Sequence, residues 1–203
     1  MAIRDIIRMG HPTLRTPAKP YPIEDIGSPR FNQLIEDLSD TLADSGGIGL
    51  AAPQINEPVQ VVIVNIPGGQ NRYGELEAVP WSVYINPVLT VLDDSRAGYW
   101  EGCLSVPGLR GFVVRPQKIA IDFYDGDGEA RSITAEGFTA TVYQHEFDHL
   151  SARLYVDHIK DPRLLVFEDQ MIAHDLGALT KELQEEVTRG IRCFLPEPVA
   201  DIS

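Results

Sequence analysis

The sequence has only two cysteines, Cys103 and Cys193, among its 203 residues. Two cysteines are too few for the disulfide framework of a small secreted protein, so an apolar core must stabilise the chain. No apolar run reaches the length of a membrane span, and the N-terminus has the composition of neither a signal peptide nor a transit peptide. We therefore expect no membrane partner and a cytoplasmic location.

Positive charge is also scarce in this sequence. The 17 Lys and Arg residues are outnumbered by 30 Asp and Glu residues, which gives a formal net charge of −13. An acidic surface repels the phosphate backbone of nucleic acids, so neither DNA nor free RNA is an expected partner. The charge is better explained as a solvated surface that keeps the protein soluble.

The apolar pattern predicts one early helix and then several strands. Ser28 followed by Pro29 indicates a helix start, apolar residues at helical spacing continue the helix, and Gly46 ends it. The Asn86-Pro87 pair indicates a bulge or bend within a strand. Extended segments are expected at 59–66, 81–92, 112–124 and 130–134, with a loop or hairpin at 67–80 and a turn at 125–128.

Helical spacing returns in the last third of the chain. One helix is predicted at 136–150, one or two more between 161 and about 189, and a frayed tail from Pro196. Strands followed by helices, rather than alternating with them, are typical of an α+β fold. We predict antiparallel sheets packed around the central helix at 136–150. Residues 1–203 would form a single domain with a C-terminal helical segment at 161–203.

The segment HEFDH at residues 145–149 matches the pattern H-E-x-x-H. On a helix, His145 and His149 share one face about 6 Å apart along the axis, so both imidazoles can reach one metal ion. Glu146 is then in position to take a proton from a metal-bound water rather than to bind the metal. Two surface histidines at this spacing are the alternative, but their apolar neighbours favour a buried metal site.

A catalytic metal site needs a third protein ligand and an open position. Cys103 is a better candidate than His158, because the residues after His149 do not follow the metzincin pattern. Gly102 lets the backbone approach closely, and a cysteine beside a divalent cation ionises to a thiolate. Without the two histidines, a lone cysteine would be expected to be a small buried apolar residue.

A third segment, GIGLAAPQ at residues 47–54, combines close-packing glycines with a polar side chain. Gln54 carries a neutral amide donor, and such a donor aimed at a developing oxyanion can lower a barrier by roughly 3 kcal/mol. A glycine-rich helix end with a surface glutamine is the alternative. No Lys-Ser or Lys-Thr pair follows, so the segment is not a phosphate-binding loop.

Together and in this order, the three segments resemble the peptide deformylase family. GIGLAAPQ at 47–54, EGCLS at 101–105 and QHEFDH at 144–149 fill every position that defines the family motifs, and weaker similarity covers roughly residues 4–160. The resemblance implies an enzyme that hydrolyses the N-formyl group from the N-terminal formylmethionine of nascent polypeptides and releases formate. It also implies one divalent metal per chain, with Fe²⁺ as the expected native ion and Zn²⁺, Ni²⁺ or Co²⁺ as the alternatives.

The resemblance assigns a role to each motif residue. The implied metal ligands are Cys103, His145 and His149. Glu146 would be the general base and later the acid, while Gln54 and the backbone N–H of Leu104 would hold the oxyanion. The expected substrate-binding residues are Ile48, Gly49, Arg110, Phe138 and Val142. Arg110 would bind the peptide backbone. The apolar residues would hold the methionine side chain of the substrate, and ordinary core packing is the alternative role for these apolar residues. We expect Arg115 to pair with an acid such as Asp148.

The sequence departs from the family in two places. Ala152 stands where the family usually has a glycine, which predicts a local packing change without loss of chemistry. Some family members carry a basic C-terminal helix suited to ribosomal RNA, but here the acidic residues outweigh the basic ones. Ribosome association through this segment is therefore not supported.

Three other functions remain as alternatives. A zinc endopeptidase would use the same helix and would not need Cys103. A cysteine hydrolase would use Cys103 as nucleophile and would survive chelation. A closed structural metal site would need a fourth ligand, for which His158 and Cys193 are the candidates. None of the three accounts for Gln54 and the glycines before it.

Overall fold

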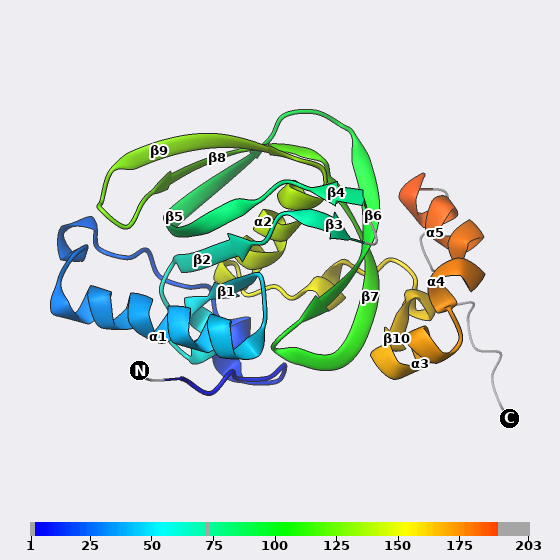
Figure 1. The fold of residues 1–203 in the computed structure, drawn as a ribbon, viewed down its shortest axis with the longest axis horizontal. Coiled ribbons are helices and arrows are strands. Elements are labelled where there is room, and N and C mark those ends of the chain that lie inside the picture. Colours follow the sequence, from blue (N-terminus) through cyan, green and yellow to red (C-terminus); the bar gives the residue numbers. More distant parts are fainter. Residues whose placement is uncertain (1–2, 72–73, 191–203) are drawn as a thin grey trace, which may run out of the picture.

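The computed structural model describes residues 3–71 and 74–190, and residues 1–2, 72–73 and 191–203 lie outside this description. Its largest element is an antiparallel five-stranded sheet in the order β1-β2-β5-β8-β9 (Figure 1). The strands are β1 Gly49–Ala51, β2 Val61–Ile66, β5 Val79–Val91, β8 Lys118–Tyr124 and β9 Ala130–Glu136. Between β2 and β5 in the sequence, β3 Gly69–Asn71 and β4 Gly74–Leu76 form a separate small hairpin.

Two helices cover opposite faces of this sheet, α1 Pro29–Ser45 and α2 Gly137–Leu150. Alternate residues of a strand point to opposite faces, and β2 divides its side chains accordingly. Val61 and Ile63 pack into the apolar cluster that contains α1, whereas Val62 and Val64 pack into the cluster that contains α2. All four side chains are fully buried, so β2 forms the centre of the core.

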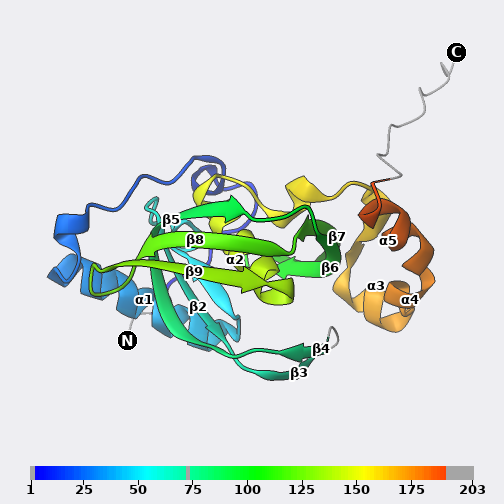
Figure 2. The same cartoon turned by 90° about the horizontal axis from the view of Figure 1, so that it is seen from above.

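A second sheet, of three antiparallel strands in the order β10-β7-β6, lies beside the first. Its strands are β6 Arg96–Cys103, β7 Val106–Pro116 and β10 Leu165–Phe167. The C-terminal helices are α3 Glu168–Ala173, α4 Leu176–Leu179 and α5 Lys181–Thr188. Figures 1 and 2 both show these helices beyond β6 and β7, at the end of the molecule away from α1. Short 3₁₀ helices occupy Pro12–Arg15, Ile23–Asp25, Ala52–Ile55, Tyr155–His158 and Pro162–Leu164.

The first helix begins and ends where the sequence predicts. The Ser28 hydroxyl accepts a hydrogen bond from the Phe31 N–H, which caps one of the unpaired donors at the start of α1. Gly46 ends the helix in the left-handed conformation, with φ of 67°. The bend in β5 is also confirmed, because Asn86 has φ of 49° and the pairing register with β8 shifts between Ile85 and Val88.

The prediction of one extended segment at 112–124 is wrong. Residues 106–116 and 118–124 form two strands in different sheets, β7 and β8, which meet at Gln117. Pro116 cannot donate a backbone hydrogen bond, which favours a strand end at this point. The short strands β1 and β10 and the longer β6 were not predicted, because their burial depends on partners that are distant in the sequence.

The broader prediction of a mixed α and β fold built on antiparallel sheets is confirmed. The predicted turn at 125–128 joins β8 to β9 as an antiparallel hairpin. The predicted tail from Pro196 lies outside the described residues. Within the described ranges, every helix is too short or too polar to span a lipid bilayer.

Candidate active site

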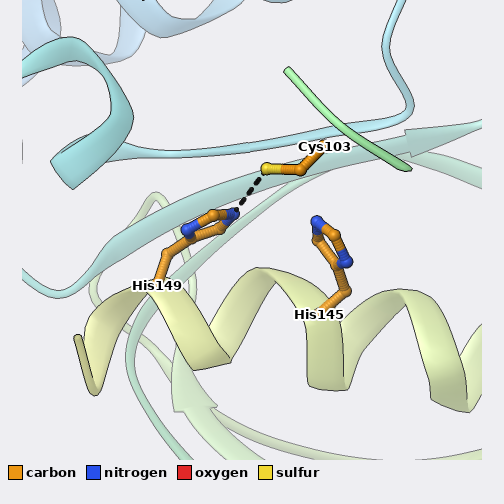
Figure 3. Close-up of side chains that lie close together, drawn as sticks. All are labelled: Cys103, His145 and His149. Atoms are coloured by element: carbon orange, nitrogen blue, oxygen red, sulfur yellow. Dashed lines mark hydrogen bonds between the residues drawn. The ribbon is translucent and has the colours of Figure 1, made fainter. Parts of the chain in front are cut away.

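Three side chains that could bind a metal converge above helix α2 (Figure 3). His145 and His149 are one turn apart on the helix, with their ring centroids separated by 5.4 Å. Cys103 ends strand β6, and its sulfur points toward both imidazole rings, 3.4 Å from Nε2 of His149. One donor atom from each of the three residues lies within 4.8 Å of the others. The strand end and the helix together therefore form a candidate site with three possible metal ligands.

The electrostatics of this cluster fit a divalent cation. Burial raises the pKa of Cys103, but the positive charge of His149 and the hydrogen bonds from both histidines outweigh burial and lower it to about 5. Burial lowers the pKa of His145, yet hydrogen bonds to Cys103 and Glu101 raise it well above its ordinary value. The negative charges of Cys103 and Glu101 thus favour a positive charge between them. One thiolate with two imidazoles is a donor set that suits Zn²⁺ and Fe²⁺.

His145 is held in place by a buried ionic network. Glu101 Oε2 accepts a hydrogen bond of 2.8 Å from Nδ1 of His145, so the other ring nitrogen faces the site. Arg115 donates to both oxygens of Glu101, at 2.6 and 3.0 Å, and to Oδ2 of Asp148 at 2.7 Å. The expected pair of Arg115 and Asp148 is therefore confirmed.

Glu101 is a site residue that the sequence reasoning did not single out. It lies two positions before Cys103 in strand β6, and alternate residues of a strand share a face. That spacing is the signal that could have identified it. His158, the alternative ligand, instead has Nε2 2.9 Å from Oδ2 of Asp148, and Cys193 lies outside the described residues.

Glu146 supplies an uncommitted carboxylate beside the three ligands. It is buried, and its Oε2 has no hydrogen-bond partner among the described residues. Burial raises the pKa of this carboxyl group. Gly49 lies against it so closely that an added Cβ would be 2.5 Å from Oε1 of Glu146. Gly49 therefore leaves space for the carboxylate, a contact that the substrate-binding prediction did not anticipate.

Gln54 is buried with its amide oriented toward Cys103. Its Oε1 accepts a hydrogen bond of 2.9 Å from the Ala51 N–H, which fixes the direction of the amide. Its Nε2 donates to Ser105 Oγ at 3.2 Å and lies 3.6 Å from the sulfur of Cys103. Ser105 is a second contact that sequence reasoning missed, although it belongs to the segment EGCLS.

A cleft of about 520 Å³ opens over these groups. Every predicted site residue except His149 lines it, including the substrate-binding candidates Ile48, Phe138 and Val142. Leu104 also lines this cleft. The structure therefore brings together segments that are up to about a hundred positions apart in the sequence.

Arg110 lies on the wall of the same cleft but is already paired. Its Nε donates to Oε1 of Glu168 at 2.9 Å, and its Nη2 donates to the same oxygen. Its guanidinium group also covers Gly102, where an added Cβ would be 2.2 Å from Nη1. A side chain at position 102 would thus displace the guanidinium of Arg110. Glu168 is a partner that no local pattern predicted.

Three candidate ligands, an open cleft and a buried carboxylate oxygen without a partner among the described residues are the features of the site in mononuclear metal-dependent hydrolases. The chain belongs to the polypeptide deformylase family, whose model matches residues 3–164. This family is metal-dependent and removes the N-formyl group from nascent peptides, and the present chain is accordingly a deformylase.

Several known proteins are similar to the chain over most of its length. Peptide deformylase of Leptospira biflexa is 39% identical over 171 residues, which cover 84% of this chain and 96% of the relative. Peptide deformylase 2 of Pseudomonas syringae pv. tomato is 45% identical over 169 residues, or 83% and 94% of the two chains.

Solved structures agree with this family assignment. The class I type b peptide deformylase from Acinetobacter baumannii with bound Met-Ala-Ser has a TM-score of 0.72 and 29% identity, covering 78% of this chain and 99% of that one. The peptide deformylase from Ehrlichia chaffeensis in complex with actinonin has a TM-score of 0.71 and 28% identity, covering 90% and 98%.

Proposed function

We propose that this chain deformylates N-formylmethionyl peptides in the cleft above α2, which acts as the central catalytic helix. Cys103, His145 and His149 would hold one divalent cation. When bound, the cation would supply an ionised nucleophile at neutral pH and would polarise the formyl carbonyl. The observation that carries the proposal is the buried Oε2 of Glu146, which has no hydrogen-bond partner among the described residues and belongs to the residue that follows His145.

Glu146 acts as the general base and then as the acid. Its Oε2 is free to accept a proton from the attacking water and to return it to the departing amine. Burial raises the pKa of this group, which brings its proton affinity closer to that needed at neutral pH. Gly49 leaves room for the carboxylate in this position, because an added Cβ would lie 2.5 Å from Oε1.

Gln54 and the backbone N–H of Leu104 stabilise the oxyanion. The amide of Gln54 is held by the Ala51 N–H, so its donor nitrogen already points toward the metal ligands before substrate arrives. A donor that needs no reorganisation during the reaction stabilises developing charge more effectively than water does. Leu104 directly follows the ligand Cys103, which supports a role for its N–H at the same point.

The methionine side chain of the substrate occupies the apolar part of the cleft formed by Ile48, Phe138 and Val142. Gly49 completes this wall. Arg110 binds the peptide backbone near the entrance, because only two of its five N–H donors are taken by Glu168. A formyl group has a hydrogen where other acyl groups have a carbon substituent, so a tight site around the formyl carbon excludes bulkier acyl groups.

The native cation in this proposal is Fe²⁺, with Zn²⁺, Ni²⁺ or Co²⁺ as substitutes. Thiolate and imidazole ligands suit iron and zinc, and a thiolate–iron pair would make the enzyme sensitive to oxygen. A reaction on nascent chains belongs in the cytoplasm. We do not assign a ribosome contact to α5, because its Glu182, Glu185 and Glu186 outweigh Lys181 and the adjacent Arg189.

The test is formate release from formyl-Met-Ala-Ser by anaerobically purified protein, with metal measured on the same sample. We expect Glu146→Gln to lose at least about a hundredfold in kcat/KM while it retains one metal per chain. Glu24→Gln, an exposed residue far from the cleft, is the matched control. Full activity in Glu146→Gln would refute the assigned base, and activity that survives chelation would favour a cysteine hydrolase instead.

A further inference from the structure

A second cavity, of about 390 Å³, adjoins the first and is built mainly by the C-terminal helices. The two cavities share three wall residues, which are Trp100, Arg110 and Glu168. The other walls of the second cavity include Met171 and Ile172 of α3. The two cavities therefore meet at Arg110, and the second lies against helices α3–α5, whose place in the fold Figure 2 shows.

The C-terminal segment is docked firmly enough to form such a wall. Val187 of α5 is buried, and it packs with Trp100, Phe112 and Leu164 in a separate apolar cluster. Strand β10 pairs with β7 so that Val166 lies opposite Arg110, which brings the next residues into contact with the cleft. The family match ends at residue 164, so Glu168 and the walls from α3 are features beyond the matched region.

The lining of the second cavity is apolar and acidic. Met171 and Ile172 offer apolar surface, and Ile172 is 76% exposed although it is a large aliphatic side chain. Glu168 and Asp175 contribute negative charge. Arg110 is the one cation among the described residues that line it, and it is already neutralised by Glu168. The net local charge therefore favours cationic over acidic groups.

We propose that this second cavity binds the part of the peptide substrate that follows its third residue, with a preference for an apolar and then a cationic side chain. The inference rests on the proposed function, which places the formyl end at Cys103. The Arg110 guanidinium lies against Gly102, the neighbour of Cys103, so a bound peptide passes Arg110 as it leaves the first cleft. Glu168 pairs with Arg110, and Ile172 lies one helical turn farther along α3, about 6 Å along the axis. An extended peptide covers about 3.3–3.6 Å per residue, so two residues beyond Arg110 reach Ile172.

The experiment compares kcat/KM for formyl-Met-Ala-Ser with that for the same peptide extended by Leu-Lys or by Leu-Glu. We expect the Leu-Lys peptide to exceed the tripeptide by about fivefold or more, and to exceed the Leu-Glu peptide. Ile172→Asn should remove the gain from the extension while leaving the tripeptide rate unchanged. Leu179→Asn, at an equally exposed leucine of α4 that does not line the cavity, is the matched control.

Asp175→Asn tests the charge preference separately. It should reduce the discrimination between the Lys and Glu peptides without affecting the tripeptide, because only the distal residue meets this carboxylate. Equal kcat/KM for all three peptides in the unmodified protein would overturn the inference and leave deformylation intact. Absence of formate from every peptide would instead overturn the proposed function, and the inference with it.

Discussion

At the scale of single residues, Gly49 determines the space available to Glu146. A Cβ on Gly49 would lie 2.5 Å from Oε1 and 2.7 Å from Cγ of Glu146, far inside van der Waals contact. Gly49→Ala should therefore displace the carboxylate and lower kcat/KM by about 10- to 100-fold, because misplacement by 1 Å has effects of this size. Metal content should stay unchanged, which can be measured on the assayed sample.

Gly126→Ala is the control for this prediction. A Cβ at Gly126 would meet Val83 at 3.6 Å, an ordinary contact, so its kinetics should equal those of the parent protein. A Gly49→Ala variant with parental kcat/KM would show that Glu146 adjusts freely and is not held by this contact.

Ala152 is a residue whose backbone conformation does not suit its side chain. It has φ of 60°, in the left-handed region, directly after the turn that ends α2. The left-handed conformation costs a residue with a Cβ roughly 1–2 kcal/mol, while glycine loses about 0.5–1 kcal/mol more chain entropy than alanine on folding. Ala152→Gly should therefore raise the free energy of unfolding by about 0.5–1 kcal/mol in denaturant titration.

Replacement of a second alanine, Ala43, by glycine should have the opposite effect on the free energy of unfolding. Ala43 is exposed within α1, where glycine lowers stability by up to about 1 kcal/mol. The two Ala→Gly changes should thus have opposite signs. Destabilisation by both would mean that position 152 carries no strain. The glycine usual in the family at this position is explained by the same backbone requirement.

At the scale of elements, Arg115 joins strand β6, strand β7 and helix α2. It contacts Glu101 and Asp148, and its side chain is only 5% exposed. Arg115→Met would remove the guanidinium from the buried Glu101 and the partly buried Asp148 and leave each with one histidine partner, which should lower the free energy of unfolding by about 3–5 kcal/mol. Because Glu101 orients His145, metal affinity should also fall by about 10- to 100-fold. Denaturant titration and metal competition would measure the two effects.

Arg131→Met serves as the comparison for this network. Arg131 pairs with Asp125 on the surface, where solvent weakens the interaction, so we expect little change in Tm or in metal affinity. If Arg115→Met were as stable as Arg131→Met, the buried network would not be the link between the sheets and the helix.

Helices α3, α4 and α5 depend on the sheet beneath them. None is longer than eight residues, which is too short for stability in isolation. These helices are held in place by the apolar cluster around Trp100 and Val187 and by the ion pair between Arg110 and Glu168. The same contacts that hold the segment also give the groove its distal wall.

At the scale of the whole molecule, the candidate cation site connects the two sheets. Cys103 comes from the three-stranded sheet, while His145 and His149 come from the helix that covers the five-stranded sheet. A ligand present at a hundred times its Kd stabilises the folded state by about 2.7 kcal/mol. Chelation should therefore lower Tm by about 5–10 °C, and added metal should restore it, in a thermal unfolding experiment.

Cys103→Ala controls for effects of the chelator itself. This variant lacks one ligand, so its Tm should change little between chelator and added metal. Equal Tm values for the metal-loaded and metal-free parent protein would show that the cation does not couple the sheets, whatever its role in the reaction.

The sequence by itself predicted the candidate ligands and the candidate general base, because the geometry of the helical part of the site is local. Helical periodicity puts His145, Glu146 and His149 in fixed relative positions, and the segments around Cys103 and Gln54 are specific enough to reveal the family. The ends of α1 were likewise predictable, since Ser28 and Gly46 act on their own backbone neighbours.

Only the tertiary structure decided which distant groups meet. Glu101 orients His145 across 44 positions, and Glu168 pairs with Arg110 across 58. No periodicity encodes such contacts, because they arise from the packing of the two sheets and the C-terminal helices. The same reason explains why 112–124 divides into two strands and why a second cavity extends the cleft: both depend on how the sheets lie against each other, which spacing along the chain does not specify.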